Sequence, residues 1–149
     1  MCIDGNVYVV GGSDGGSHLK SAEMYDRSAG QWRALPETSV ARAGCAAVCI
    51  EGNVYAVGGN DVRSSLKSAE MYDPSAGQWR ALPEMSVARA GCAAVGIEGK
   101  LYVVGGSDGT VQLASVECYD PVANEWRTLP SMSTARAFCA AAVGDMGAG

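Results

Sequence analysis

The side chains that could do chemistry in this sequence recur at one interval. Three arginines (Arg42, Arg89, Arg136) and three aspartates (Asp14, Asp61, Asp108) each stand 47 residues apart. A ring of arginines could grip an acidic peptide by bidentate contacts, and a ring of carboxylates would attract a basic ligand. Both sets also have structural explanations: each arginine could be tied to a neighbouring acid such as Glu23, Glu70 or Glu117, and each aspartate could cap its own turn. The sequence leaves both interpretations open.

Catalysis and metal binding have little support. A copper or zinc site commonly uses several imidazoles, and this chain has one histidine, His18. Its place is taken by Ser65 and Gln112 at the same interval. No particular serine and carboxylate stand out as partners of His18 in a catalytic triad. We therefore expect no catalytic residue, no metal and no cofactor, and predict that the chain is not an enzyme.

The same interval of 47 residues separates other residue types along the whole chain. Double glycines begin at Gly11, Gly58 and Gly105, and tryptophans stand at 32, 79 and 126. A fixed period of this length is typical of an array of supersecondary units, none of which can bury its apolar face alone. We expect one repeat domain over residues 1–149, with repeats at approximately 2–48, 49–95 and 96–142.

One repeat predicts four strands joined by short turns. We expect the strands over residues 88–97, 100–104, 115–119 and 125–129. Glu98-Gly99 is a two-residue turn whose glycine can take a positive φ, and Asn124 can adopt the left-handed conformation in the next turn. Pro130 ends the last strand, as is typical of a sheet edge.

Side-chain size changes across each predicted sheet. Alanine, glycine and cysteine dominate the first strand, whereas tryptophan marks the last. Sheets arranged like spokes need small residues near the axis and allow large ones at the rim. The sequence therefore predicts an all-β fold, a β-propeller built of four-stranded antiparallel blades.

The order of these motifs closely resembles the kelch repeat. An arginine-containing small strand is followed by Tyr-x-Val-Gly-Gly, then Glu-x-Tyr-Asp, then a spaced tryptophan and Leu-Pro. The resemblance covers nearly the whole chain. It implies a propeller, most often six-bladed, that binds other proteins, in some members as the substrate-recognition part of a ubiquitin-ligase adaptor and in others as an actin binder. Adaptor members carry helical domains before the propeller, and these 149 residues show none, so the adaptor role does not follow from the fold.

The repeats are cut so that one strand is left over. The chain begins with the end of an inner strand, and a further inner strand is expected near residues 137–143, able to complete a first blade. Three blades are fewer than the usual four to eight of a closed ring. Two alternatives stay open: two copies of the chain form a six-bladed ring as a homodimer, or the sequence is part of a longer array with further blades.

A partner-binding surface is expected at the loops after the double glycines. The first two repeats differ at eight positions, and four of these fall in that one loop. The candidate partner-binding residues are Ser13, Asp14, His18, Arg42, Asn60, Asp61, Arg63, Arg89, Ser107, Asp108, Gln112 and Arg136. Variable loops on a constant frame favour contact with another protein or a peptide. Drift of unconstrained loops explains them equally, and an assembly piece whose role is self-association is the alternative function.

Composition narrows the partners. The chain is 48% apolar and 18% charged, as expected of a packed globular protein. Its net charge of −5 and its lack of a basic run argue against nucleic-acid and membrane binding.

The cysteines follow the repeat, and Cys118 stands where the other repeats have methionine. Cysteines that exchange with methionine are expected to be buried, reduced thiols, which favours a cytoplasmic location.

Overall fold

The computed structural model describes residues 5–144, and within this range eleven strands form three antiparallel sheets with no helix. The first sheet consists of β1 (Val7–Val10), β2 (Ala22–Asp26) and β3 (Gln31–Leu35). The second consists of β4 (Ala46–Ile50), β5 (Asn53–Val57), β6 (Ala69–Asp73) and β7 (Gln78–Ala81). The third consists of β8 (Ala93–Ile97), β9 (Lys100–Val104), β10 (Val116–Asp120) and β11 (Glu125–Leu129). Each sheet is a meander in chain order, so each is one propeller blade.

The predicted strands and turns are present with one large shift in bounds. Strands β9 and β11 have the expected limits, whereas the strand expected over 88–97 begins only at Ala93. The residues before it belong to the connection between blades, where their backbone bonds to loops and not to a ladder. Glu98 and Gly99 have φ of 50° and 78°, so both turn residues are left-handed, as a tight hairpin requires.

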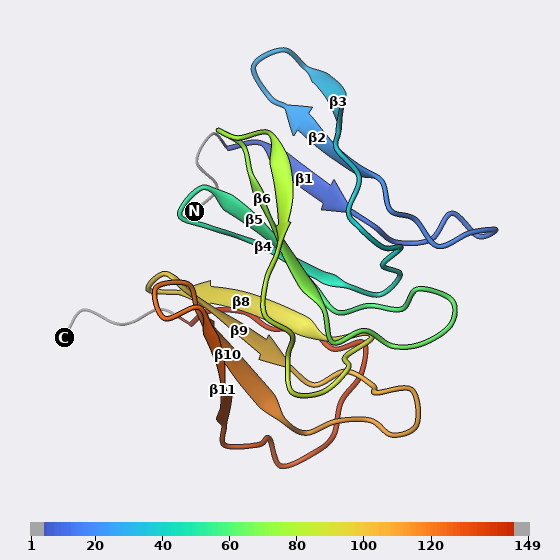
Figure 1. Ribbon diagram of the computed structural model, residues 1–149, viewed down its shortest axis with the longest axis vertical. Helices are drawn as coiled ribbons and strands as arrows, with labels where there is room; N and C mark the ends of the chain where they lie inside the picture. The colour runs from blue at the N-terminus through green and yellow to red at the C-terminus, as the bar shows by residue number, and fades with distance from the viewer. Residues whose placement is uncertain (1–4, 145–149) are drawn as a thin grey trace.

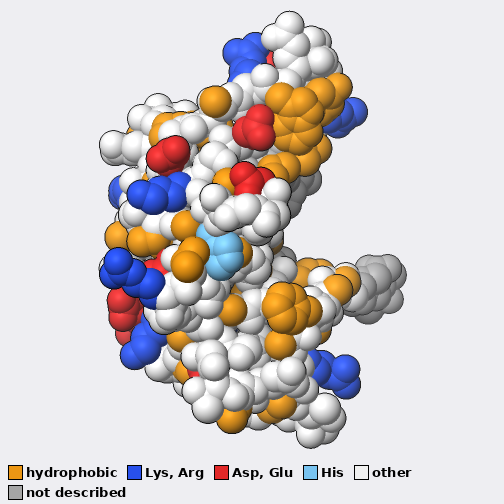
Figure 2. Space-filling model, turned by 90° about the vertical axis from the view of Figure 1, so that its right-hand side faces the viewer, with side chains coloured by type: hydrophobic (Ala, Val, Ile, Leu, Met, Phe, Trp, Pro, Cys, Tyr) orange, Lys and Arg blue, Asp and Glu red, His pale blue; other side chains and the backbone are white. Residues whose placement is uncertain are grey.

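The three blades fan around one side of an axis, and the array is open (Figure 1). The long loops that follow β1, β5 and β9 gather at one end, and Figure 2, which views that end, shows a molecule shaped like a C. Near the axis the blades are linked by backbone bonds: Gly91 N donates to Gly44 O at 2.8 Å, and Phe138 N donates to Gly91 O at 2.7 Å. These three residues occupy equivalent places in successive repeats.

The core lies between the blades. One cluster joins the first and second blades and includes Val10, Val54 and Tyr72. A second cluster joins the second and third blades and includes Val57 and Leu101. Each blade therefore buries its faces only against its neighbours, which is why the repeats must be stacked to be stable.

The strand expected near residues 137–143 is not formed within the described chain, where residues 137–144 carry no strand assignment. A strand requires a partner for its ladder, and the first blade, which has no inner strand among residues 5–144, lies at the other end of the array. Among residues 5–144 there is no helix that could span a membrane.

Candidate functional site

The loop end of the array contains a groove near the axis. It measures about 380 Å³ and is lined by residues from all three repeats. The lining consists of His18, Ala43, Gly44, Asn60, Ser65, Ala90, Gly91, Ser107, Gly109 and Phe138. Loops from successive blades thus form one continuous surface, as expected from strands that all end on the same side.

Three of the predicted site residues meet in this groove. His18 Nδ1 lies 3.1 Å from Asn60 O, so the loop of the first blade touches that of the second. Ser107 lines the same groove from the third blade. The groove walls also include the backbone of Gly44 and Gly91, which leave space because they have no side chain. The groove therefore offers an imidazole, an amide and a hydroxyl around a small uncharged cavity.

The three repeated aspartates act as caps within their own loops. Asp14 Oδ1 accepts from Gly16 N and Ser17 N at 2.9 and 2.7 Å. Asp61 and Asp108 do the same with the backbone two and three residues ahead, at 2.8–3.0 Å. These backbone donors hold the pKa of each carboxyl below its usual range, because they stabilise the ionised form.

Capping does not remove the aspartates from the surface. Only Oδ1 of each carboxylate is used in the described loops; Asp14 is exposed, and Asp61 and Asp108 are partly exposed. The structural explanation is confirmed, and the loop end still carries three ionised carboxylates. Ser13, Arg63 and Gln112 are exposed in the same loops but do not line the groove.

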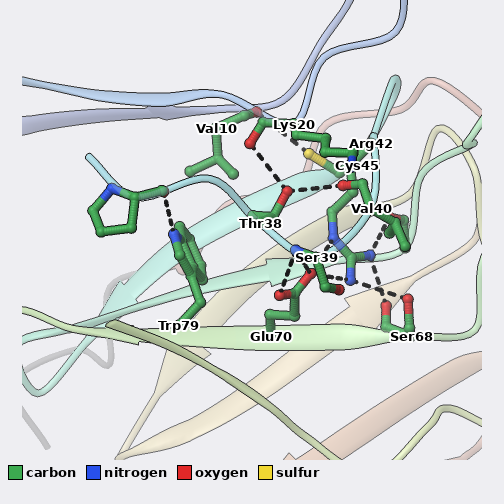
Figure 3. A network of polar contacts seen from close by, with 12 residues as sticks. Val10, Lys20, Thr38, Ser39, Val40, Arg42, Cys45, Ser68, Glu70 and Trp79 are labelled. Atoms are coloured by element: carbon green, nitrogen blue, oxygen red, sulfur yellow. Dashed lines mark hydrogen bonds and ion pairs between the residues drawn. The ribbon is translucent and has the colours of Figure 1, made fainter. Parts of the chain in front are cut away.

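Arg42 is part of the interior and not of the loop surface (Figure 3). Its exposure is 0%, and each of its five N–H groups has an acceptor. Nε and Nη2 donate to Glu70 Oε2 at 3.1 and 2.7 Å, Nη1 donates to Gly58 O and Ser68 O, and Nη2 also donates to Ser68 Oγ. Glu70 Oε1 in turn accepts from Ser39 N at 3.0 Å.

Arg89 repeats this network one blade further along. Its Nε and Nη2 lie 3.0 and 2.9 Å from Glu117 Oε2, and Gly105 O and Ser115 accept the remaining N–H groups. The expectation that Arg42 and Arg89 face a partner is therefore wrong: a guanidinium with no exposed surface and no unused donor has nothing to offer a ligand. The alternative, in which each is tied to a neighbouring acid, is confirmed.

Arg136 holds the same place in the third repeat but has a different environment. Its backbone is placed like those of the other two, with Arg136 N donating to Leu113 O at 3.0 Å and its carbonyl accepting from Gly106 N at 2.7 Å. Its side chain is exposed, and it makes no hydrogen bond or ion pair with any described residue. The difference arises because no blade follows the third one within residues 5–144.

Seven of the ten lining residues are not among the predicted site residues, and Phe138 is the aromatic one of the seven. Phe138 occupies the position of Gly44 and Gly91, adopts φ of +55° and is 82% exposed. Its ring lies against Gly91, where an added Cβ would be 3.1 Å from the ring. The departure from glycine at this one repeat is the only sequence signal for it, and it places an aromatic ring at the edge of the groove.

Two of the repeated cysteines are enclosed between the blades. Cys45 and Cys92 point their sulfurs at the carbonyls of Val10 and Val57, at 3.5 and 3.7 Å. Burial raises the pKa of the Cys92 thiol to about 12, so this thiol stays protonated. Cys92 is buried and Cys45 partly buried, and in the described chain both pack as small hydrophobes.

Comparison with known proteins agrees with the repeat architecture. The family model described as the kelch motif matches three times, over residues 1–39, 41–86 and 88–133. Of 161 matching chains among solved structures, one titled "Structure of YjhT" aligns with a TM-score of 0.76 and 21% identity, covering 92% of this chain. The aligned part is 52% of that chain, so this chain spans about half of its length. No curated protein matches. Three matches in register over most of the length show that the chain belongs to the kelch-repeat family.

Proposed function

We propose that the chain is a non-catalytic protein-interaction module that presents its loop end to another protein or a peptide. The observation that carries this proposal is the groove at the axis, where loop residues from all three repeats share one cavity. The first two repeats differ at eight of 47 positions, and two of these differences, Ser13/Asn60 and His18/Ser65, involve residues that line this cavity. A constant frame with a varied contact surface suits recognition.

The electrostatics of the loop end favour a basic ligand. Backbone donors lower the pKa of Asp14, Asp61 and Asp108, so these carboxylates are ionised at neutral pH. Arg42 and Arg89 are buried and do not offset this charge. Arg63 is exposed in the same loop as Asp61, whereas the loops of Asp14 and Asp108 contain no arginine. We therefore propose a segment that carries lysine or arginine near the aspartates and a small polar or apolar group in the groove. Actin binding and substrate-adaptor binding, which the kelch resemblance implies, are two partner classes that this proposal includes.

A library of random peptides displayed on phage tests the loop end directly. Selected peptides are expected to be basic and to bind at least tenfold more weakly to a chain with Asp14, Asp61 and Asp108 changed to asparagine. Asparagine keeps the Oδ1 acceptor of the cap and removes the charge, so the loops remain folded. Glu51→Gln and Glu98→Gln, in exposed turns at the other end of the blades, serve as the matched control. Equal loss in both sets, or no selected peptide, would contradict the proposal.

A second candidate is an assembly role, in which self-association is itself the function. It is favoured by the uncovered face of the first blade, where Val7, Val9 and Trp32 are about half exposed, at 50%, 47% and 53%. Such a face is a liability unless something covers it. The two functions separate by experiment, because the loop aspartates are not on this face.

A further inference from the structure

The two open ends of the array have the character of two halves of one interface. Val7 and Val9 on the first blade are 50% and 47% exposed. The residues at the same positions of the second blade, Val54 and Ala56, are 2% and 0% exposed, because the first blade covers them. Val7 and Val54 are the same residue type at the same place in the repeat, so their difference in exposure comes from the missing neighbour.

The first blade also carries an unfilled arginine site. In the second blade, Gly58 O, Ser68 and Glu70 surround the Arg42 guanidinium, and in the third blade Gly105 O, Ser115 and Glu117 surround Arg89. The residues at these places in the first blade are Gly11, Ser21 and Glu23. Glu23 is exposed, whereas Glu70 is 3% and Glu117 is 1% exposed, and its carboxylate has no hydrogen-bond or ion-pair partner among the described residues.

The matching arginine stands at the opposite end. The backbone of Arg136 is already fixed to the third blade by the bonds to Leu113 O and Gly106 N that its counterparts also make, so its side chain emerges where the next blade would lie. That side chain is exposed and finds no acceptor in residues 5–144. One end thus presents a cation without its acceptors, and the other presents the acceptors without their cation.

Two further features match across the ends. Trp79 Nε1 and Trp126 Nε1 donate to Pro36 O and Pro83 O of the preceding repeat, at 2.8 and 2.7 Å. Trp32, the equivalent residue of the first blade, is 53% exposed and makes no such bond in the described chain. Pro130, one repeat after Pro83, is the equivalent proline of the third blade, so the two open ends carry the two halves of this contact.

The unpaired inner segment gives the second match. In the second blade Ala46 of β4 pairs with Val57 of β5. Residue 140 stands two repeats after Ala46, and Val10 of β1 stands one repeat before Val57, so residue 140 of one copy is the equivalent partner of Val10 in the other. Residues 140–143 read Ala-Ala-Ala-Val, which is the small-residue character of the other inner strands. The inner edge of β1 has no partner strand among the described residues, and residues 140–143 at the far end of the array are a segment of suitable size and composition to fill it.

We infer that the occupant of each open end is a second copy of this chain, bound head to tail so that Arg136 of one copy enters the site formed by Gly11, Ser21 and Glu23 of the other. Two such contacts close a ring of six blades, each copy lending residues 140–143 to the first blade of the other. Closure at two copies agrees with the alignment, in which three blades superimpose on about half of a longer chain. This inference deepens the assembly role proposed above and is independent of the loop-end function.

A charge-swap experiment tests the contact. By light scattering coupled to size exclusion, the chain is expected to have a mass near twice 15.3 kDa. Arg136→Glu and Glu23→Arg each place two like charges at both interfaces and are expected to halve the mass. An equimolar mixture of the two variants contains one native pair and one reversed pair, and is expected to recover the dimer mass. Arg63→Glu, which changes an exposed arginine in the middle blade, is the matched control and is expected to stay dimeric.

The outcomes separate the inference from the role it rests on. A wild-type monomer, or an open polymer larger than two copies, overturns both the closed dimer and the assembly role of this chain. A dimer that survives both single substitutions overturns the Arg136–Glu23 contact and leaves self-association standing. Recovery in the mixture shows that the single variants fold, so a lost dimer in either one alone is not a folding defect.

Discussion

Arg89 and Glu117 meet at a single carboxylate oxygen, with Nε and Nη2 of the arginine 3.0 and 2.9 Å from Oε2 of the glutamate. The arginine backbone is bonded to the second blade through Leu66 O, and the glutamate belongs to β10 of the third blade. The pair therefore fastens one blade to the next. Side-chain exposures of 0% and 1% show that it does so inside the protein.

Removal of the arginine should be costly. Arg89→Ala leaves Glu117 as a buried carboxylate without its cation, and we expect a loss of about 3–5 kcal/mol in the free energy of unfolding. Urea denaturation followed by circular dichroism measures this loss. Arg63→Ala, in an exposed loop, should change the free energy by less than about 0.5 kcal/mol. Similar losses in the two variants would show that the buried pair does not join the blades.

The first glycine of the double glycine is required for two reasons: its positive φ, and the close approach of its Cα to the backbone of the arginine that precedes the next blade. Gly58 has φ of +66°, and an added Cβ would lie 2.2 Å from Arg89 O. Gly77 has nearly the same φ, +67°, with nothing within 4 Å of an added Cβ. Gly77→Ala should therefore cost about 1–2 kcal/mol, the penalty of a left-handed alanine, and Gly58→Ala clearly more. Equal costs in thermal unfolding would mean that φ alone explains the glycine.

Much of the fold could be predicted because its signals are local. The Glu98-Gly99 turn and the strand 100–104 depend on residues that are adjacent in sequence, and repetition made each signal visible three times. The start of the inner strand was placed five residues too early, at 88 in place of Ala93. Its first residues are small and apolar like a strand, but the connection to the previous blade takes their backbone hydrogen bonds.

The site was less predictable because exposure depends on distant parts of the chain. A repeated arginine is compatible with a ligand ring or with a buried network, and only the positions of Gly58 O and Ser68 decide for Arg42. Arg136 is exposed although it holds the same place in its repeat, because no further blade follows it within residues 5–144. The repeat pattern does not point to Phe138, because the pattern rests on residues that recur and Phe138 replaces a glycine.

Acid should weaken the loop caps. The pKa values of Asp14, Asp61 and Asp108 are lowered in the folded chain by backbone hydrogen bonds. A lowered folded-state pKa contributes stability that is present above the unfolded value, near 3.9, and that is lost as the pH falls through the folded value. Carboxyl chemical shifts in an NMR titration should give midpoints below 3.8, the ordinary value. Midpoints at or above this value would show that the caps do not form in solution.

The indole N–H groups report on the open end of the array. Trp79 and Trp126 each donate to a proline carbonyl of the preceding repeat, so their Nε1 protons should exchange slowly with solvent. Trp32 makes no such bond within the described chain, and it should exchange fast in a monomer and slowly in the proposed dimer, where Pro130 of the other copy supplies the carbonyl.

Hydrogen exchange followed by NMR over a dilution series measures the exchange rate of each indole proton, with Trp→Phe variants assigning the three signals. Protection of Trp32 should appear at the concentration where the mass doubles and should be absent in Arg136→Glu, while Trp79 and Trp126 stay protected throughout. Fast exchange of Trp32 in a sample of dimer mass would place the contact between copies elsewhere than at the first blade.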